Sequence, residues 1–392
     1  MIQPTQDQAY TKIHNTRVVL DLIREKRPLS RVEIARLTGM SSATITRIVS
    51  DLIRIGVVCE TTPFSTKVGR KAILLDIVSD AALCFAVDIA PSLLRAGIVD
   101  YKGEVLCQRE YAIVCREHTP QQYAKLVHKS LLELCAALPG EKEVVCAGAT
   151  VIGIVDHAAG MVRFAPQLGW KEVPIAALLE EALSLPVAIH NDVDAQILGE
   201  AQSLGLDKKS VAYLSVGKGV GSSMLLDGRV VEGDSDICGE IGHTIIELQG
   251  LQCSCGRRGC LQTFIGENSV LQRARMKDPA IKSMRQLVAC YHEGTPWARE
   301  LIEQTATYLA VAINNLGCMH NPQTIILGGE LIRSYPFLFE LAQQHLGDLL
   351  YEPLRGNLQL LCTKSRGMSG ILGIAQLSQE RYVDQLIEDN IF

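Results

Sequence analysis

The sequence predicts an α/β protein with an N-terminal winged helix-turn-helix domain and an actin-like (ribonuclease-H-like) body of two lobes. Three observations support this fold. Two amphipathic segments joined by a glycine-containing turn lie near the start of the chain. Short apolar strands alternating with helical segments begin near residue 83. The 392 residues, 47% of them hydrophobic, are enough for more than one core.

Composition indicates a cytoplasmic chain without a membrane segment. The mean hydropathy is +0.16, yet no apolar run approaches the roughly 18 to 20 residues that cross a bilayer. The first residues lack the basic and apolar regions of a signal peptide. Thirteen cysteines, an odd number scattered through apparent core segments, are expected to be reduced thiols rather than disulfides.

Charge is unevenly divided along the chain. Residues 1–71 carry 12 Lys or Arg and 6 Asp or Glu, whereas residues 72–392 carry 26 and 37, so the head is +6 and the remainder is −11. A basic head on an acidic body is typical of a polyanion-binding module attached to another domain. Charge alone does not distinguish such a module from an ordinary basic surface exposed to solvent.

The head is predicted to contain three helices. The first covers residues 14–26 and ends before Pro28. Ser30 is expected to cap the second helix, with Glu33 at the capping-box position. Thr38-Gly39-Met40 forms the turn to a third helix, capped by Ser41 or Ser42. The apolar side of the second helix is expected to be Val32, Ile34, Ala35 and Leu37.

A helix-turn-helix reads DNA mainly through the start of its second helix. Two strand-like runs, 57–61 and 72–76, follow the third helix and predict a wing between them. Basic residues at a wing tip suit phosphates or a minor groove. The alternative is a helical hairpin packed on the body with no role in DNA binding. The candidate DNA contacts are Ser41, Ser42, Thr44, Thr46 and Arg47 in the helix and Lys67, Arg70 and Lys71 in the wing.

The body begins with three short apolar strands between residues 83 and 106, followed by an amphipathic helix over 120–137 and a buried strand over 144–152. This order predicts an actin-like lobe. Trp170 is read as a core aromatic rather than a pocket lid, and a last helix over 369–378 is expected to close the second lobe. We divide the chain into a winged helix-turn-helix domain (1–78), a first lobe (79–195) and a second lobe (196–392) with an oligomerisation surface.

His243, Cys253, Cys255 and Cys260 supply one imidazole and three thiolates within 18 residues. This is a complete donor set for a closed tetrahedral Zn²⁺ site. Gly256 and Gly259 fit a loop that wraps around an ion. Ordinary buried or free cysteines are the alternative. Four protein ligands leave no open position for an activated water, so the predicted zinc is structural.

Gly239-Glu240-Ile241-Gly242-His243 and Cys253-Ser254-Cys255-Gly256-Arg257-Arg258-Gly259-Cys260 together resemble the signature of the ROK family of sugar kinases and repressors. The resemblance covers about residues 80–380 and implies the two-lobed sugar-kinase fold. It further implies that Glu240 and the second ring nitrogen of His243 bind sugar hydroxyls. Asn191 and Asp192 match the family's Asn-Asp pair, in which the carboxylate is the general base of the kinases. The resemblance also assigns Gly153 and Gln262 to the sugar side, although the family has glutamate at the position of Gln262.

The segment Asp88-Ile89-Ala90-Pro91-Ser92 favours a regulator over a kinase. The family's kinases have D-x-G-x-T here, a hairpin whose backbone approaches the ATP phosphates. Ala90 adds a Cβ and Pro91 removes an N–H donor, which should weaken nucleotide binding. The resemblance thus implies a sugar-responsive repressor without enzymatic activity, acting as a homodimer or homotetramer with operator DNA and a sugar or sugar phosphate as partners. The alternative is a sugar kinase that retains a DNA-binding domain, with Asp192 as its base.

Overall fold

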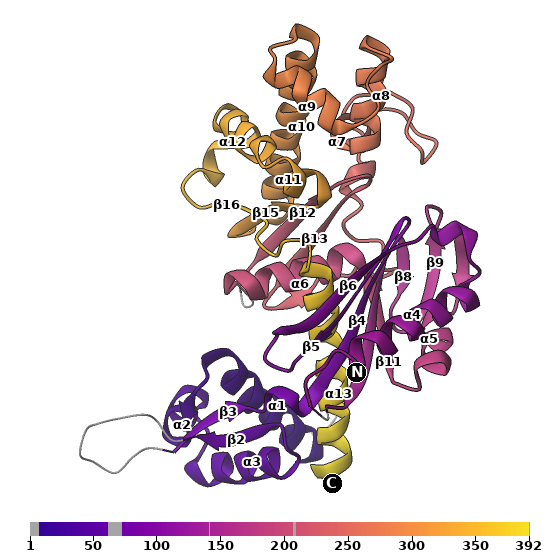
Figure 1. The fold of residues 1–392 in the computed structure, drawn as a ribbon. Helices are drawn as coiled ribbons and strands as arrows, with labels where there is room; N and C mark the ends of the chain where they lie inside the picture. The colour runs from indigo at the N-terminus through magenta and orange to yellow at the C-terminus, as the bar shows by residue number, and fades with distance from the viewer. Residues whose placement is uncertain (1–7, 62–72, 141, 207–208, 392) are drawn as a thin grey trace.

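The computed structural model describes residues 8–61, 73–140, 142–206 and 209–391. The head contains three helices and a small antiparallel sheet of order β1-β3-β2 (Figure 1). Its helices are α1 (Gln8–Lys26), α2 (Arg31–Thr38) and α3 (Ser42–Arg54). Its strands are β1 (Leu29–Ser30), β2 (Val58–Thr61) and β3 (Leu74–Ile77). This is the predicted winged helix-turn-helix architecture.

Local capping explains the boundaries of α2 and α3. The Ser30 hydroxyl accepts the Glu33 N–H while the Glu33 carboxylate accepts the Ser30 N–H, so the predicted capping box is present. Gly39 ends α2 at φ 71°, a conformation that glycine adopts at little cost. Ser41, not Ser42, caps α3, because its hydroxyl accepts the N–H of Thr44.

One side of α2 departs from the prediction. Ile34 is buried and Ala35 half-buried, but Val32 and Leu37 are 78% and 42% exposed. The helix is only eight residues long, so a narrow stripe centred on Ile34 is enough to contact α1 and α3. The other two apolar side chains project into solvent.

The first lobe is built on a five-stranded sheet of order β11-β7-β4-β5-β6. Strands β4, β7 and β11 are parallel, whereas β4, β5 and β6 form an antiparallel meander. Its strands are β4 (Leu83–Ala90), β5 (Leu93–Val99), β6 (Val105–Ala112), β7 (Val144–Val151) and β11 (Val187–Asn191). Helices α4 (Pro120–Cys135) and α5 (Ile175–Leu183) accompany it, with a small sheet of β8 (Ile154–Asp156), β9 (Met161–Ala165) and β10 (Trp170–Val173). Trp170 lies in this core, as predicted.

The second lobe has a sheet of order β14-β13-β12-β15-β16. Its strands are β12 (Val211–Val216), β13 (Val220–Leu226), β14 (Arg229–Val230), β15 (Thr324–Gly328) and β16 (Gln359–Cys362). Its helices are α7 (Gln262–Ile265), α8 (Glu267–Lys277), α9 (Met284–His292), α10 (Pro296–His320), α11 (Glu330–Ser334) and α12 (Phe337–Leu349). One apolar cluster joins α10 and α12 to this sheet. Repetition of a five-stranded sheet in both lobes agrees with the predicted actin-like body.

Two helices lie between the lobes, α6 (Asp192–Leu204) and α13 (Ser369–Ile391). They cross closely because both carry glycine at the contact. A Cβ on Gly373 would meet the Ala195 carbonyl oxygen at 1.8 Å, and one on Gly199 would meet the Ser369 carbonyl oxygen at 2.1 Å. These two positions therefore exclude every larger side chain.

The last helix lies elsewhere than expected. Rather than closing the second lobe, α13 packs on β4 and β7 of the first lobe through Ile371, Ile374 and Ala375. It also continues past residue 378 and reaches the head (Figure 1). There Val383 and Ile387 lie in the apolar core of the head. The apolar surface of α13 is longer than the second lobe could bury. It is therefore buried against the first lobe and the head.

Two predictions based on composition can be compared with the structure. All thirteen cysteines lie within the described residues, and each is a free thiol. No helix in the described part of the chain is both long and apolar enough to cross a membrane.

Candidate functional site

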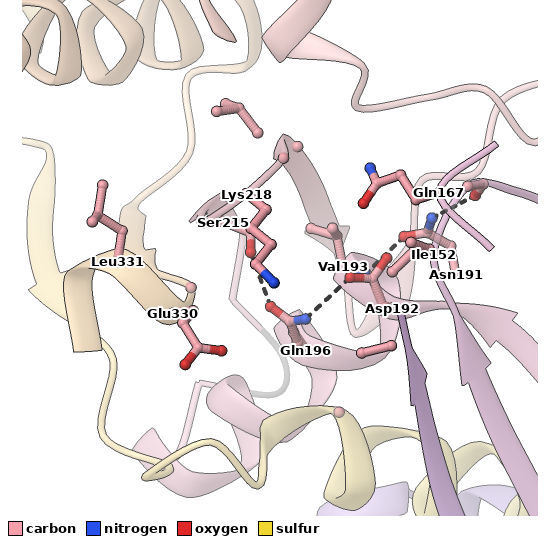
Figure 2. Close-up of a pocket in the computed structure, with 18 of the residues that line it drawn as sticks. Ile152, Gln167, Asn191, Asp192, Val193, Gln196, Ser215, Lys218, Glu330 and Leu331 are labelled. Atoms are coloured by element: carbon pink, nitrogen blue, oxygen red, sulfur yellow. Dashed lines mark hydrogen bonds between the residues drawn. The ribbon is translucent and has the colours of Figure 1, made fainter. Parts of the chain in front are cut away.

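A cavity of about 930 Å³ lies between the two lobes (Figure 2). The first lobe contributes the β4–β5 turn and the ends of β7 and β11, and the second lobe contributes the β12–β13 turn and the segment before the cysteine loop. All six residues that the sequence assigned to ligand binding line this cavity: Gly153, Asn191, Asp192, Glu240, His243 and Gln262. The fold thus brings together segments that are up to 109 positions apart in the sequence.

Asn191 caps α6 and is held on three sides. Its Oδ1 accepts the N–H groups of Val193 and Asp194, and its Nδ2 donates to the Gly153 carbonyl oxygen over 2.8 Å. One N–H of the amide stays free for a ligand. Gly153 itself has φ 99° and a Cβ there would meet the Phe164 carbonyl oxygen at 2.3 Å, so the turn beside Asn191 requires glycine.

Asp192 is a half-buried carboxyl at the first position of α6. Burial, followed by repulsion from Asp88 and Asp194, raises the pKa of Asp192 to about 8. Gln196 donates to its Oδ2 over 3.4 Å (Figure 2). The carboxyl is therefore mostly protonated at pH 7 and can donate as well as accept a hydrogen bond.

Asp88, near the end of β4, is paired with one arginine and accepts a hydrogen bond from one threonine. Arg95 Nη1 lies 3.2 Å from Asp88 Oδ2, and Thr150 Oγ1 donates to Oδ1 over 2.9 Å. Arg95 also donates to Glu110 and to the Gly367 carbonyl oxygen. Burial still raises the pKa of Asp88, with Arg95 opposing that shift. An arginine thus occupies the space beside this carboxylate.

The glycine-rich β12–β13 turn lies beside the β4–β5 turn at the cavity. Lys218, in the β12–β13 turn, lies with its Nζ 3.5 Å from the hydroxyl of Ser92 in the β4–β5 turn. Gln262 supports the same turn, because its Oε1 accepts the Val220 N–H over 3.2 Å. Gln262, where the family has glutamate, therefore uses one lone pair of its Oε1 in a hydrogen bond within the protein.

The cysteine loop has the donor spacing of a tetrahedral zinc site. The ligand atoms of His243, Cys253, Cys255 and Cys260 all lie within 4.8 Å of one another. Cys253 Sγ lies 3.6 Å from His243 Nδ1, and Cys255 Sγ lies 3.6 Å from Cys260 Sγ. Bonds of about 2.3 Å to sulfur and 2.0–2.1 Å to nitrogen place tetrahedral S and N donors about 3.6 Å apart and two S donors about 3.8 Å apart. The donor set fits Zn²⁺.

His243 connects this loop to the cavity. Its Nδ1 faces Cys253, and its Nε2 lies 3.9 Å from Glu240 Oε2. An ion held by Nδ1 would leave Nε2 directed toward Glu240 and the cavity. The family resemblance implies this orientation for a histidine shared by metal and ligand, and that shared role stays a prediction.

The head presents the start of α3 to solvent. Ser41, Ser42, Thr46 and Arg47 are exposed and Thr44 is half-buried. The Ser41 hydroxyl accepts the Thr44 N–H at the cap of α3. Thr46 Oγ1 donates to the Ser42 carbonyl oxygen. Among the described residues nothing forms a hydrogen bond or ion pair with Arg47. The predicted wing contacts Lys67, Arg70 and Lys71 lie outside the described residues.

Some lining residues were missed by the sequence analysis. Arg95 could have been found, because a two-residue turn at Pro91-Ser92 places Asp88 directly opposite Arg95 in the hairpin. Gln167, Arg257 and Arg333 also line the cavity. They come from loops and helices whose approach depends on the tertiary fold, so no local pattern indicated them.

The fold and site define a class of protein with a winged helix-turn-helix head and an actin-like body that encloses a ligand cleft. The sequence profile of the ROK family matches residues 84–381, and a winged helix-turn-helix DNA-binding profile matches residues 14–58. The chain belongs to the ROK family.

Several known proteins are similar to this chain over most of its length. The xylose repressor of Bacillus spizizenii is 23% identical over 96% of this chain and 98% of its own length. The DNA-binding transcriptional dual regulator NagC of Escherichia coli is 24% identical over 88% of each chain. A crystal structure of a ROK family transcriptional regulator, described as a homolog of the E. coli MLC protein, has a TM-score of 0.80 at 24% identity. It covers 97% of this chain and 99% of that chain.

Proposed function

We propose that this ROK family member is a sugar-responsive transcriptional repressor that binds operator DNA through its head and an inducer sugar or sugar phosphate between its lobes. The observation that carries the proposal is the combination of an exposed α3 with a polar cleft in one chain. The xylose repressor and the dual regulator NagC, which align with 96% and 88% of this chain, support the same function.

The DNA-binding part of the proposal rests on the surface of α3. The start of a recognition helix contacts base edges, and an arginine there can pair with guanine or phosphate. Arg47 meets that requirement because it is exposed and makes no hydrogen bond or ion pair within the described residues. We assign Ser42 and Thr46 to the same surface, with Ser41 and Thr44 beside them and Lys67, Arg70 and Lys71 in the wing. One helix reads few base pairs, so we propose a homodimer or homotetramer that presents two heads.

The sugar-binding part rests on a set of complementary donors and acceptors. The neutral Asp192 carboxyl and the free N–H of Asn191 can donate to sugar oxygens, whereas Glu240 accepts from hydroxyl groups. His243 Nε2 and the remaining lone pair on Gln262 Oε1 would add two further contacts. We propose Zn²⁺ in the cysteine loop, where it would fix His243 and perform no chemistry, because the four ligands close its coordination.

The alternative, a sugar kinase, is disfavoured by the β4–β5 hairpin. Arg95 pairs with the Asp88 carboxylate and with the Gly367 carbonyl oxygen in the cleft. Pro91 removes a backbone donor from the turn that would hold phosphates. A site with its carboxylate neutralised and a donor missing is poorly suited to a magnesium–nucleotide complex.

The domains that we assign, 1–78, 79–195 and 196–392, are joined by α13. Its first turn carries Ser369 and Gly370, which line the cavity, and its last turns enter the core of the head. A continuous helix with partners at both ends can move the head when the cleft closes on a ligand. This is the physical connection that we propose between sugar binding and operator affinity.

Two measurements on the full-length protein discriminate between repressor and kinase. A coupled ATPase assay with hexoses, pentoses and amino sugars should give no turnover above background. In a thermal shift assay a sugar or sugar phosphate should raise Tm, whereas ATP should not, since a ligand that binds the folded state stabilises it. Sugar-dependent ATP turnover would refute the proposal.

A further inference from the structure

Two histidines and two carboxylates form a cluster apart from the cleft and the cysteine loop. His157 follows β8 and His190 lies in β11, so both belong to the first lobe. Glu232 and Asp236 lie in the segment after β14 of the second lobe. None of these four residues lines the cavity or belongs to the Cys/His loop.

The spacing of these side chains approaches that of a metal site. His157 Nε2 lies 3.6 Å from Glu232 Oε2, and the ligand atoms of His157, His190 and Glu232 all lie within 4.8 Å of one another. Nitrogen and oxygen donors at about 2.0–2.2 Å from a tetrahedral ion are about 3.4 Å apart. Closing a separation of 4.8 Å to that spacing needs a movement of about 1.4 Å.

Asp236 orients one of the histidines. Its Oδ1 lies 3.5 Å from His157 Nδ1, on the side of the ring opposite the nitrogen that faces Glu232. Histidines that bind metals commonly direct their other nitrogen toward a carboxylate, which fixes the tautomer and the ring position. The pair His157–Asp236 has that arrangement.

His190 has a ring-nitrogen lone pair that no described residue uses. Its ring makes no hydrogen bond with any described residue and stacks on His157 with a centroid distance of 4.8 Å. A metal lies in the plane of each ring that binds it, so one ring must rotate about its Cβ–Cγ bond, a torsion with broad preferences.

We propose that His157, His190 and Glu232 form a second metal site, which binds a divalent transition metal such as Zn²⁺, Co²⁺ or Ni²⁺. Imidazole and carboxylate donors suit these ions, whereas Mg²⁺ and Ca²⁺ prefer oxygen donors alone. Three protein ligands leave one position for water or another small ligand. Because the histidines come from one lobe and the glutamate from the other, the ion links the two lobes.

The test uses the full-length protein, stripped with a chelator and then titrated with Co²⁺. The thiolate loop and the histidine site have different spectra, because only the loop gives an intense sulfur-to-cobalt charge-transfer band. The wild type is expected to bind two equivalents. Over the Co²⁺ range that fills both sites of the wild type, Glu232→Gln and His190→Gln should each bind only one equivalent, because the affinity of the second site falls at least tenfold. Both variants should retain the charge-transfer band. Cys255→Ala should lose the band and keep the second equivalent.

His320→Gln is the matched control, because His320 is exposed at the end of α10 and lies outside both clusters. It should bind two equivalents with the same affinities as the wild type. Glu232→Gln tests the site without disturbing a strand, so its result stands even where His190→Gln fails to fold. A wild type that binds one equivalent, or a Glu232→Gln protein that still binds two, would show an ion-pair cluster only and overturn the proposal.

Discussion

Arg17 in α1 donates a hydrogen bond from Nε to Asp384 Oδ1 in α13 over 2.6 Å, so the first helix of the chain is tied to the last. Arg24 and Glu380 form a second link at 2.9 Å between the same two helices. The first pair is about 40% exposed on each side and is worth no more than about 1 kcal/mol. The apolar contacts below these pairs therefore carry most of the attachment of the head.

Ile387→Ala tests that attachment. Ile387 is fully buried in the core of the head, so truncation should cost about 2–5 kcal/mol in the stability of the head. The expected result is a separate, lower unfolding transition for the head in calorimetry, while the lobes keep theirs. Leu132→Ala, at a position 58% exposed on α4, is the control and should leave the thermogram unchanged. An unaltered thermogram for Ile387→Ala would remove the role given to α13.

Arg47→Ala tests the recognition surface. Loss of one phosphate or base contact should weaken DNA binding by about 1–3 kcal/mol if the arginine reads a base. If it contacts phosphate, the slope of log K against log salt should fall by about 0.9. Fluorescence anisotropy titrations at several salt concentrations distinguish a base contact from a phosphate contact. Arg109→Ala, at an exposed position of β6 in the first lobe, should bind DNA as the wild type does. Equal affinity of the two variants for DNA would contradict the assignment.

Cys255→Ala tests the metal loop. The variant should lose the metal of the Cys/His site, because three donors and one vacancy bind zinc far less tightly than four. The lobes should remain folded on their own cores, while the inducer no longer alters DNA affinity, since His243 loses its support. Metal analysis and a DNA titration measure the two effects. Cys238→Ala, an exposed thiol outside the loop, is the control, and a full sugar response without the metal would argue against the coupling.

Asp88→Asn tests the buried ion pair by its pH dependence. Burial raises the pKa of Asp88 in the folded chain above its unfolded value near 4. A raised carboxyl pKa contributes stability that is fully present below the unfolded pKa and is lost as pH rises through the folded pKa. The neutral asparagine should therefore flatten the decline of Tm above pH 4. Asp227→Asn, in an exposed turn, should keep the wild-type profile, and two parallel profiles would show that Asp88 is not perturbed.

Local sequence signals predicted the parts of the fold that depend on neighbouring residues. The Ser30–Glu33 capping box lies within one helical turn, and the cysteine loop lies within 18 residues. The prediction that α13 packs on the second lobe was wrong. The apolar residues of this helix show that the helix is buried, but they do not show which domain covers it. The pairing of His157 with Glu232 depends on how the lobes meet, so no spacing in the sequence indicated it. The six cleft residues were brought together as the family resemblance implied, and their contacts with a sugar stay predictions.

The most direct test of the central claim is a DNA titration with and without sugars. The full-length protein would select a duplex from a random-sequence pool, and anisotropy would then measure its affinity in the presence of xylose, glucose, N-acetylglucosamine and their phosphates. At least one compound should weaken DNA binding tenfold or more, a coupling of about 1.4 kcal/mol. Glu240→Ala should keep the DNA affinity and lose the response. Failure to select any sequence, or an affinity that none of these compounds changes, would contradict a sugar-responsive repressor.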